Sequence, residues 1–248
     1  MNAEIILRGL EKDASLIDES IQDWWLSYLH GHFNRYLETL SVLFKLGLHG
    51  KILDVGSVPG HFTVLLKRLG YNVVGVDINP KRCMKFFQKY NLKVEKVDIE
   101  TEKLPFQDNS FDFVLFMEML EHLRINPLFA LREIYRVLKS PGYMVLTTPN
   151  ITLPMRISFL LGKSYQGNPA EEFAKLDRIG HMGHIRLYTL HEIRQLLEFS
   201  GFKVEYFMHL GKTKGGWKTK LLRLLYPKQR EFKPYLCVIS SPNKPPKL

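Results

Sequence analysis

The chain of 248 residues is 45% apolar and carries a formal net charge of +10. This length and apolar content allow one α/β domain with a full core, and we expect residues 1–248 to form a single domain. No apolar stretch approaches the roughly 20 residues that cross a bilayer, and the first residues lack the pattern of a signal peptide, so a cytoplasmic protein is expected.

The predicted elements begin with helices. Residues 15–46 are expected to form two helices with aromatic faces, including Trp24 and Tyr28, and Gly31 is the expected break between them. Residues 1–47 would then be a helical lid over a core of residues 48–211. The aromatic side chains of this lid either close a pocket or simply pack.

Strand and helix patterns alternate through the core. The expected strands are 51–55, 72–77, 93–97, 111–117 and 142–148, and the expected helices are 60–69, 80–89 and 126–138. This alternation predicts a Rossmann-like, doubly wound, mostly parallel sheet with right-handed crossovers. An insertion, residues 149–184, follows the fifth strand and precedes a helix at 189–200 and a strand at 202–209.

The turn after the first strand contains Gly56 and Gly60, which allow backbone conformations closed to other residues and close approach to a ligand. Asp54 ends this strand and Asp77 ends the next. Ligands of doubly wound sheets bind outside the carboxyl ends of the strands, where Asp77 can accept hydrogen bonds from both hydroxyls of a ribose. The pattern predicts a nucleotide site at this edge.

The segment Asp54-Val-Gly-Ser-Val-Pro-Gly60 resembles the Asp-x-Gly-x-Gly-x-Gly loop of the class I methyltransferases that use S-adenosylmethionine (SAM). Val58 replaces the middle glycine. The resemblance extends over about residues 33–209 and includes 104–112, the segment before the fourth strand. It implies a seven-stranded sheet whose last strand, 235–240, is antiparallel.

The same resemblance implies SAM as cofactor and a set of residues that hold it. Asp77 would bind the ribose, and Asp98 with Ile99 would lie beside the adenine. The alternative roles are a helix cap for Asp77 and a turn acid for Asp98. The implied cofactor-binding residues are Asp54, Gly56, Ser57, Gly60, Asp77, Ile78, Asp98, Ile99 and Met117.

The fourth strand leads into a Glu-x-x-Glu-His pattern, in which Glu118, Glu121 and His122 resemble the motif of ubiquinone-biosynthesis O-methyltransferases and of small-RNA 3′-terminal methyltransferases. His184 lies where those families place a further histidine. The resemblance implies a site for Mg²⁺ or Mn²⁺ made by these four residues. It also implies catalytic roles for Glu121, His122 and His184, with His184 as general base. The alternative is a structural or cofactor contact without metal.

Residues 212–248 hold ten basic residues against Glu231 alone, so residues 1–211 carry little net charge. Within 212–230, helical spacing predicts a basic amphipathic helix whose apolar stripe is Trp217, Leu221, Leu224 and Leu225. Such a helix can contact an anionic membrane or a phosphate backbone, and the alternative is a solvated basic face on a helix packed against the domain.

These patterns predict a SAM-dependent methyltransferase that methylates a hydroxyl of a small or lipid-linked acceptor. An RNA methyltransferase is less favoured, because the basic charge is confined to the C-terminal segment. A third hypothesis is a non-catalytic SAM-binding module in which Val58 has altered the loop. The sequence indicates neither the acceptor nor the oligomeric state.

Overall fold

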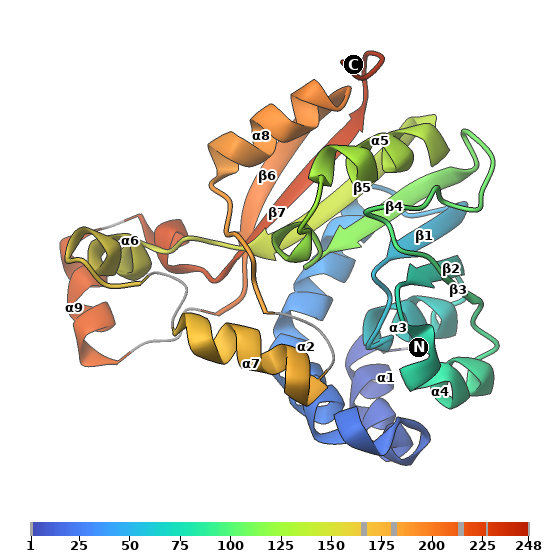
Figure 1. The fold of residues 1–248 in the computed structure, drawn as a ribbon, viewed down its shortest axis with the longest axis horizontal. Coiled ribbons are helices and arrows are strands. Elements are labelled where there is room, and N and C mark those ends of the chain that lie inside the picture. Colours follow the sequence, from blue (N-terminus) through green and yellow to red (C-terminus); the bar gives the residue numbers. More distant parts are fainter. Residues whose placement is uncertain (1, 165–167, 180–182, 213–215, 227, 248) are drawn as a thin grey trace.

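One seven-stranded sheet forms the centre of the molecule (Figure 1). The computed structural model describes residues 2–164, 168–179, 183–212, 216–226 and 228–247. The strand order is β3-β2-β1-β4-β5-β7-β6. The strands are β1 Lys51–Val55, β2 Asn72–Asp77, β3 Val94–Lys96, β4 Phe111–Met117, β5 Leu138–Pro149, β6 Phe202–Leu210 and β7 Tyr235–Pro242.

The sheet is mixed, with a single reversal near one edge. β1 pairs in parallel with β2 and β4, β2 with β3, and β4 with β5. β7 lies between β5 and β6 and is antiparallel to both. The prediction of a mostly parallel, doubly wound sheet with an antiparallel last strand is confirmed.

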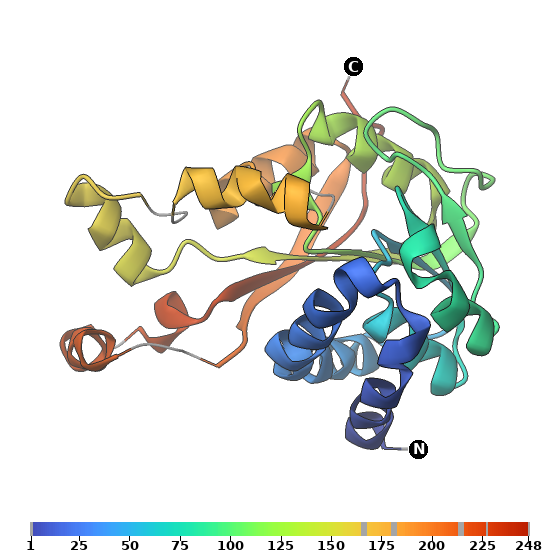
Figure 2. The same ribbon diagram turned by 60° about the horizontal axis from the view of Figure 1, so that its bottom comes forward.

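Helices cover both faces of the sheet, which Figure 2 shows nearly edge-on. The helices are α1 Ala3–Gly9, α2 Gln22–Lys45, α3 His61–Arg68, α4 Met84–Lys89, α5 Pro127–Val137, α6 Leu153–Leu160, α7 Pro169–Ile179, α8 Leu190–Phe199 and α9 Trp217–Leu225. One apolar core joins α1–α4 to one face, and a second joins α5 and α8 to the other. Successive residues of β1 serve opposite cores: Ile52 belongs to the first, and Leu53 and Val55 to the second.

The N-terminal helices differ from the prediction. α2 is one helix of 24 residues that continues through Gly31, so the expected break there is wrong. Gly31 is exposed, with open space where a side chain would stand, and its cost of about 1 kcal/mol is small beside the buried stripe that includes Trp25, Leu29 and Tyr36. α1 and the 3-10 helix Leu10–Leu16, which precede the predicted helices, add Ile6, Leu7 and Leu10 to the core.

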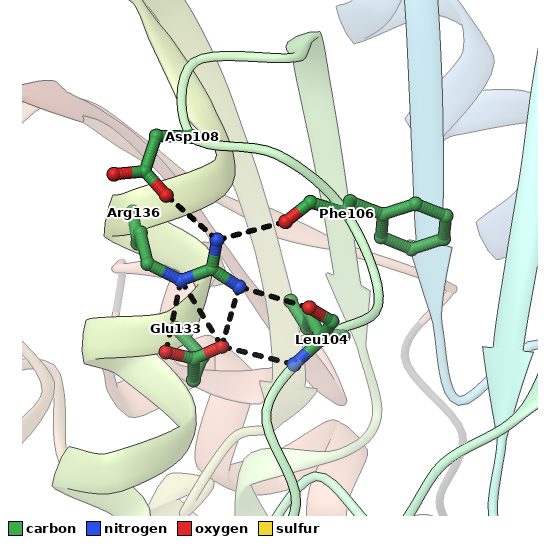
Figure 3. A network of polar contacts seen from close by, with 5 residues as sticks. All are labelled: Leu104, Phe106, Asp108, Glu133 and Arg136. Atoms are coloured by element: carbon green, nitrogen blue, oxygen red, sulfur yellow. Dashed lines mark hydrogen bonds and ion pairs between the residues drawn. The ribbon is translucent and has the colours of Figure 1, made fainter.

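A network around Arg136 of α5 fixes the loop that precedes β4 (Figure 3). The guanidinium donates to the backbone oxygens of Leu104 and Phe106, at 2.9 and 2.8 Å, and to Asp108 Oδ1 at 2.8 Å. Glu133 Oε2 accepts from Arg136 Nη2 at 2.7 Å and from the backbone N–H of Leu104 at 2.9 Å. The network therefore holds a loop whose beginning, residues 98–100, borders the candidate site.

One end of the molecule holds α6 and α9. In both views α6 and α9 lie beyond the sheet at this end (Figures 1 and 2). α6 packs against the 3-10 helix Gln229–Phe232, and Arg156 Nη1 lies 3.2 Å from Glu231 Oε2. In the described part of the chain, no helix combines the length and apolar character that crossing a membrane requires.

Candidate functional site

A cavity of about 270 Å³ opens at the carboxyl ends of β1, β2 and β4. Helix α2 and the turn between β1 and α3 both contribute to its walls. Every residue that the resemblance assigns to the cofactor lines this cavity: Asp54, Gly56, Ser57, Gly60, Asp77, Ile78, Asp98, Ile99 and Met117. The cavity occupies the place where doubly wound sheets bind their ligands.

Two positions of the turn between β1 and α3 have no room for a side chain. Gly56 and Gly60 have φ of +78° and +89°. A Cβ on Gly56 would come within 2.1 Å of Met119 Sδ, and one on Gly60 within 2.5 Å of Phe87 Cε1. Among the described residues, Val58 is not one of those with positive φ. A side chain at position 58 is therefore compatible with the turn, and the departure from the glycine pattern does not distort it.

Asp77 braces the two loops that border the cavity. Its Oδ2 accepts from the backbone N–H of Val58 at 3.0 Å, and its Oδ1 accepts from that of Asn79 at 2.8 Å. The side chain is largely buried and lines the cavity. Each carboxylate oxygen has a second lone pair, so these contacts leave Asp77 able to accept from a hydroxyl of a bound ligand.

Asp54 is buried at the end of β1. Its Oδ2 accepts from Thr63 Oγ1 on α3 at 2.5 Å, which fixes the strand to the helix that follows the turn. Burial raises the pKa of Asp54 to about 7, although the hydrogen bond from Thr63 opposes the shift. The Asp54 carboxyl group thus joins β1 to α3, and Asp54 is also one of the residues that line the cavity.

α2 supplies one wall of the cavity through Trp24, Tyr28, Arg35 and Tyr36. Trp25, by contrast, is fully buried, and its Nε1 donates to the backbone oxygen of Pro59 at 2.8 Å, which holds α2 on the glycine turn. The sequence analysis missed Arg35 and Tyr36. An arginine within the apolar stripe of an amphipathic helix was the available signal, since such a charge is buried only with a partner.

The partner of Arg35 is Glu118, which follows β4. Arg35 Nη1 lies 3.8 Å from Glu118 Oε1 and donates to Thr147 Oγ1 at 3.3 Å. Thr147 Oγ1 in turn donates to Glu118 Oε1 at 2.9 Å. Burial raises the pKa of Glu118, and the charge of Arg35 opposes that shift. Glu118 also has φ of +54°, an unusual conformation for a residue with a side chain, which the surrounding contacts maintain.

Three of the four predicted metal ligands come together. Glu121, His122 and His184 each offer a ligand atom within 4.8 Å of the others. Glu118 does not join this group among the described residues, because its carboxylate faces Arg35 and Thr147. Of the three, His122 is among the residues that line the cavity, and Glu121 and His184 are not.

Glu121 is fully buried beside the histidines. Its Oε2 accepts from Thr148 Oγ1 at 2.9 Å, and its Oε1 has no hydrogen-bond partner in the described part of the chain. Burial raises its pKa well above the ordinary value, and the nearby charge of Glu118 adds to the shift. A buried oxygen without a donor is the position that a cation or a proton would satisfy.

The segment around His184 is attached to the end of β4. Its neighbour Ile185 donates a backbone N–H to the backbone oxygen of Glu121 at 2.8 Å, and His122 Nδ1 donates to the backbone oxygen of Gly183 at 3.1 Å. The two imidazole rings have centroids 5.1 Å apart. His181, the other histidine of this segment, lies outside the described residues.

The sheet order, the glycine turn and the acids at the strand ends together define a class I methyltransferase of the kind that uses SAM. A family model described as a methyltransferase domain matches residues 17–206, and the chain belongs to this family.

Curated relatives match different lengths of the chain. The ubiquinone biosynthesis O-methyltransferase of Pelagibacter ubique is 34% identical over 119 residues, 46% of this chain and 48% of that protein. An uncharacterized protein of Methanocaldococcus jannaschii is 35% identical over 116 residues, which are 46% of this chain and 48% of that protein. The chain thus spans about half the length of these relatives. YodH of Bacillus subtilis, an uncharacterized methyltransferase, is 28% identical over 223 residues, 81% of this chain and 82% of its own.

Solved structures share the fold at low identity. The PH0226 protein of Pyrococcus horikoshii has a TM-score of 0.60 at 20% identity, over 87% of this chain and 92% of its own. A SAM-dependent methyltransferase of Thermotoga maritima, titled a possible histamine N-methyltransferase, has a TM-score of 0.59 at 18% identity, over 95% and 99% of the two chains. At these identities the likeness establishes the fold alone.

Proposed function

We propose that the protein transfers the methyl group of SAM to a hydroxyl oxygen of a small acceptor. The observation that carries the proposal is His122, which lines the cofactor cavity and has a ring nitrogen within 4.8 Å of ligand atoms of Glu121 and His184. The ubiquinone biosynthesis O-methyltransferase named above supports oxygen as the methyl acceptor.

The cavity residues would bind and orient the cofactor. The backbone at Gly56 and Gly60 allows close approach of the methionine part, and Asp77 accepts from the ribose hydroxyls. Displacement of a methyl group from a sulfonium requires chiefly alignment with the attacking oxygen and a partial removal of its proton. The walls formed by Trp24, Tyr28 and Met117 would exclude water from that reaction.

His122 is suited to accept the proton of the acceptor hydroxyl. Because its Nδ1 donates to the backbone oxygen of Gly183, the neutral ring carries its lone pair on Nε2. In the proposed step the acceptor oxygen forms a bond to the methyl carbon, the carbon–sulfur bond breaks, and the proton passes to His122. The sulfur leaves as the neutral thioether of S-adenosylhomocysteine. His184, whose ring lies beside that of His122, would help to hold the resulting imidazolium in place.

A divalent cation is the second candidate for activating the hydroxyl. The chemistry of Glu121, His122 and His184 fits Mg²⁺ or Mn²⁺, and the unpartnered Oε1 of Glu121 is a suitable oxygen ligand. When bound, such an ion would lower the pKa of an acceptor hydroxyl. In that case the hydrogen bond that Thr148 donates to Glu121 would orient the carboxylate of Glu121 toward the ion.

Turnover with radiolabelled SAM and a panel of catechols tests the proposed transfer to oxygen. Anilines and thiophenols of matching size serve as acceptors without hydroxyls. We expect methylated catechols, and a His122→Gln variant should retain SAM affinity while losing turnover by roughly 10²- to 10⁴-fold, the usual contribution of a general base. Transfer to the amines or thiols alone, or full turnover by His122→Gln, would contradict the proposal.

Exhaustive chelation separates the two ways of activating the hydroxyl. If the reaction is metal-free, treatment with a chelator leaves both turnover and SAM binding intact. If Glu121, His122 and His184 hold an ion, the chelator abolishes turnover, SAM binding persists, and Mg²⁺ or Mn²⁺ restores activity. A Glu121→Gln variant should then require far more of the ion, whereas Glu118→Gln should not, because Glu118 lies outside the cluster.

A further inference from the structure

The end of the molecule formed by α6 and α9 concentrates exposed apolar side chains. Of the fourteen large apolar residues that are exposed in the described part of the chain, six belong to these two helices and the residue after α6. They are Phe159, Leu160, Leu161, Leu221, Leu224 and Leu225, which we call the apolar tip. Leu160 and Leu224 are each 82% exposed, close to the exposure of an unfolded chain.

The two helices lack the burial that normally stabilises short helices. α6 has no buried residue, and none of residues 219–225 in α9 is buried. A helix of eight or nine residues is marginal in water unless one face packs against something. Of the predicted apolar stripe, Leu224 and Leu225 are therefore not packed against the domain, and Leu221 is half exposed; the side chain of Trp217 lies outside the description.

The charge around the apolar tip has one sign. Residues 151–164 contain Arg156 and Lys163 and no acid, and residues 212–230 contain seven basic residues and no acid. The nearest acid in sequence, Glu231, is paired with Arg156 at 3.2 Å. Lys163, Lys212, Lys220 and Lys228 are exposed. Exposed leucines surrounded by lysines complement a surface that is negatively charged outside and apolar beneath.

We infer that the apolar tip docks the protein on an anionic lipid bilayer. The six side chains enter the acyl boundary, and the exposed Lys163, Lys212, Lys220 and Lys228 contact the headgroups. RNA is disfavoured as the occupant, because a phosphate backbone requires the charges but gives no reason for leucines that are more than two-thirds exposed. A second copy of the chain is disfavoured, because two faces of the same positive charge would repel.

A second cavity lies between α2 and residues of α6 and α9. It has a volume of about 240 Å³, is lined by Thr152 and Pro154 before and in α6 and by Lys212 and Thr219 near α9, and shares Arg35 with the cofactor cavity. Docking through the apolar tip would therefore bring this second cavity, which reaches Arg35, near the membrane surface. This places a bilayer-embedded acceptor within the molecule's reach, a point that rests on the proposed function, whereas docking itself does not.

Flotation with lipid vesicles tests the docking without SAM or acceptor, so its outcome is independent of methyl transfer. Vesicles of phosphatidylcholine with about 30 mol% phosphatidylglycerol should carry the protein, and vesicles of phosphatidylcholine alone should not. Added salt should weaken the binding. Leu160→Glu and Leu224→Glu should each weaken it about tenfold or more, because each places a charge where an apolar side chain enters the bilayer. Ile5→Glu, at a residue of α1 that is 68% exposed and remote from this end, is the matched control and should bind like the parent chain.

Several outcomes would overturn the inference. One is the absence of binding to the anionic vesicles, and another is binding that Leu160→Glu and Leu224→Glu leave unchanged while circular dichroism shows all variants folded. Light scattering that finds a dimer, which Leu224→Glu dissociates, would identify a second copy as the occupant. Salt-dependent binding of short RNA that is indifferent to both leucine variants, together with no vesicle binding, would identify a nucleic-acid surface instead.

Discussion

Asp54 and Asp77 end neighbouring parallel strands, yet their surroundings give them different properties. Asp54 is fully enclosed and accepts from Thr63, and burial raises its pKa to about 7. Asp77 accepts from two backbone N–H groups at the border of the cavity. The first residue joins the strand to the helix, and the second braces the two loops that border the cavity.

Replacing Asp77 should weaken SAM binding. Charge-assisted hydrogen bonds contribute roughly 1.5–3 kcal/mol, so Asp77→Ala should raise the dissociation constant by about one to two orders of magnitude in calorimetry. Asp77→Asn, which keeps one acceptor oxygen, should fall between. Glu205→Ala, on β6 far from the cavity, should bind like the parent chain. Unchanged affinity in a folded Asp77→Ala variant would remove Asp77 from the site.

The shifted pKa of Asp54 predicts a pH dependence of stability. The folded state holds the proton up to about pH 7, whereas the unfolded chain loses it near its ordinary value of 3.8. Stability from this group is therefore present at low pH and is lost as the pH rises toward and through 7. Between pH 5 and pH 8 the loss amounts to about 2–3 kcal/mol. Urea unfolding should show that Asp54→Asn, which keeps an acceptor for Thr63, removes this loss; equal slopes for both chains would refute the assignment.

At the scale of elements, α2 joins parts of the chain that are distant in sequence. Arg35 reaches Glu118 after β4 and Thr147 in β5, His32 Nδ1 lies 3.0 Å from the hydroxyl of Tyr235 in β7, and Trp25 reaches the glycine turn. These contacts keep the cofactor cavity closed on one side. α2 is thus a fixed wall as well as a cover.

The pair of Arg35 and Glu118 should be strongly coupled. Arg35→Met leaves a buried carboxylate without its cation, and we expect a loss of about 3–5 kcal/mol in the free energy of unfolding. The double variant Arg35→Met with Glu118→Gln should recover most of this loss, because the amide still accepts from Thr147. A double-mutant cycle in urea measures the coupling. Additive costs would mean that the two side chains act independently.

The sequence predicts the central elements well, because strands buried on both faces, such as β1 and β4, consist mostly of apolar residues, each interrupted by one aspartate, and are bounded by turns. Both strands have the predicted bounds, 51–55 and 111–117. The wall of the cavity that the strand ends form also follows from the prediction of parallel strands. The contribution of α2 does not follow, because its side chains reach the cavity only through tertiary packing. Gly31 was misleading for the same reason: packing outweighs a local preference.

The candidate catalytic cluster was only partly predictable. The spacing of Glu121 and His122 gives their proximity directly, but the approach of His184 depends on backbone bonds from residues 183–186 to Glu121 and His122. The motif could not distinguish the orientation of Glu118 from that of Glu121. That difference arises from the positive φ of Glu118 and from Arg35, a residue outside the motif.

At the scale of the whole molecule, the cofactor cavity has walls from α2 and from three strands, so a ligand there should stabilise the fold as one unit. S-adenosylhomocysteine at a hundredfold excess over its dissociation constant should add about 2.7 kcal/mol to the free energy of unfolding. For a chain of this size that corresponds to a rise of roughly 5–10 °C in melting temperature. Thermal unfolding at increasing ligand concentration checks it, and a melting temperature independent of concentration would contradict the site.

The long reach of α2 also has a consequence during synthesis. His32 and Tyr235 are 203 residues apart, and Arg35 and Thr147 are 112 apart. At roughly 5–20 residues per second, about 10–40 s pass on the ribosome between the appearance of α2 and that of the tyrosine it contacts. Such non-local pairing also slows folding, since the intervening chain must first be ordered. The contact of α2 with the last strand is therefore made only after all the residues that line the cofactor cavity, which lie between Trp24 and Arg124, have been synthesised.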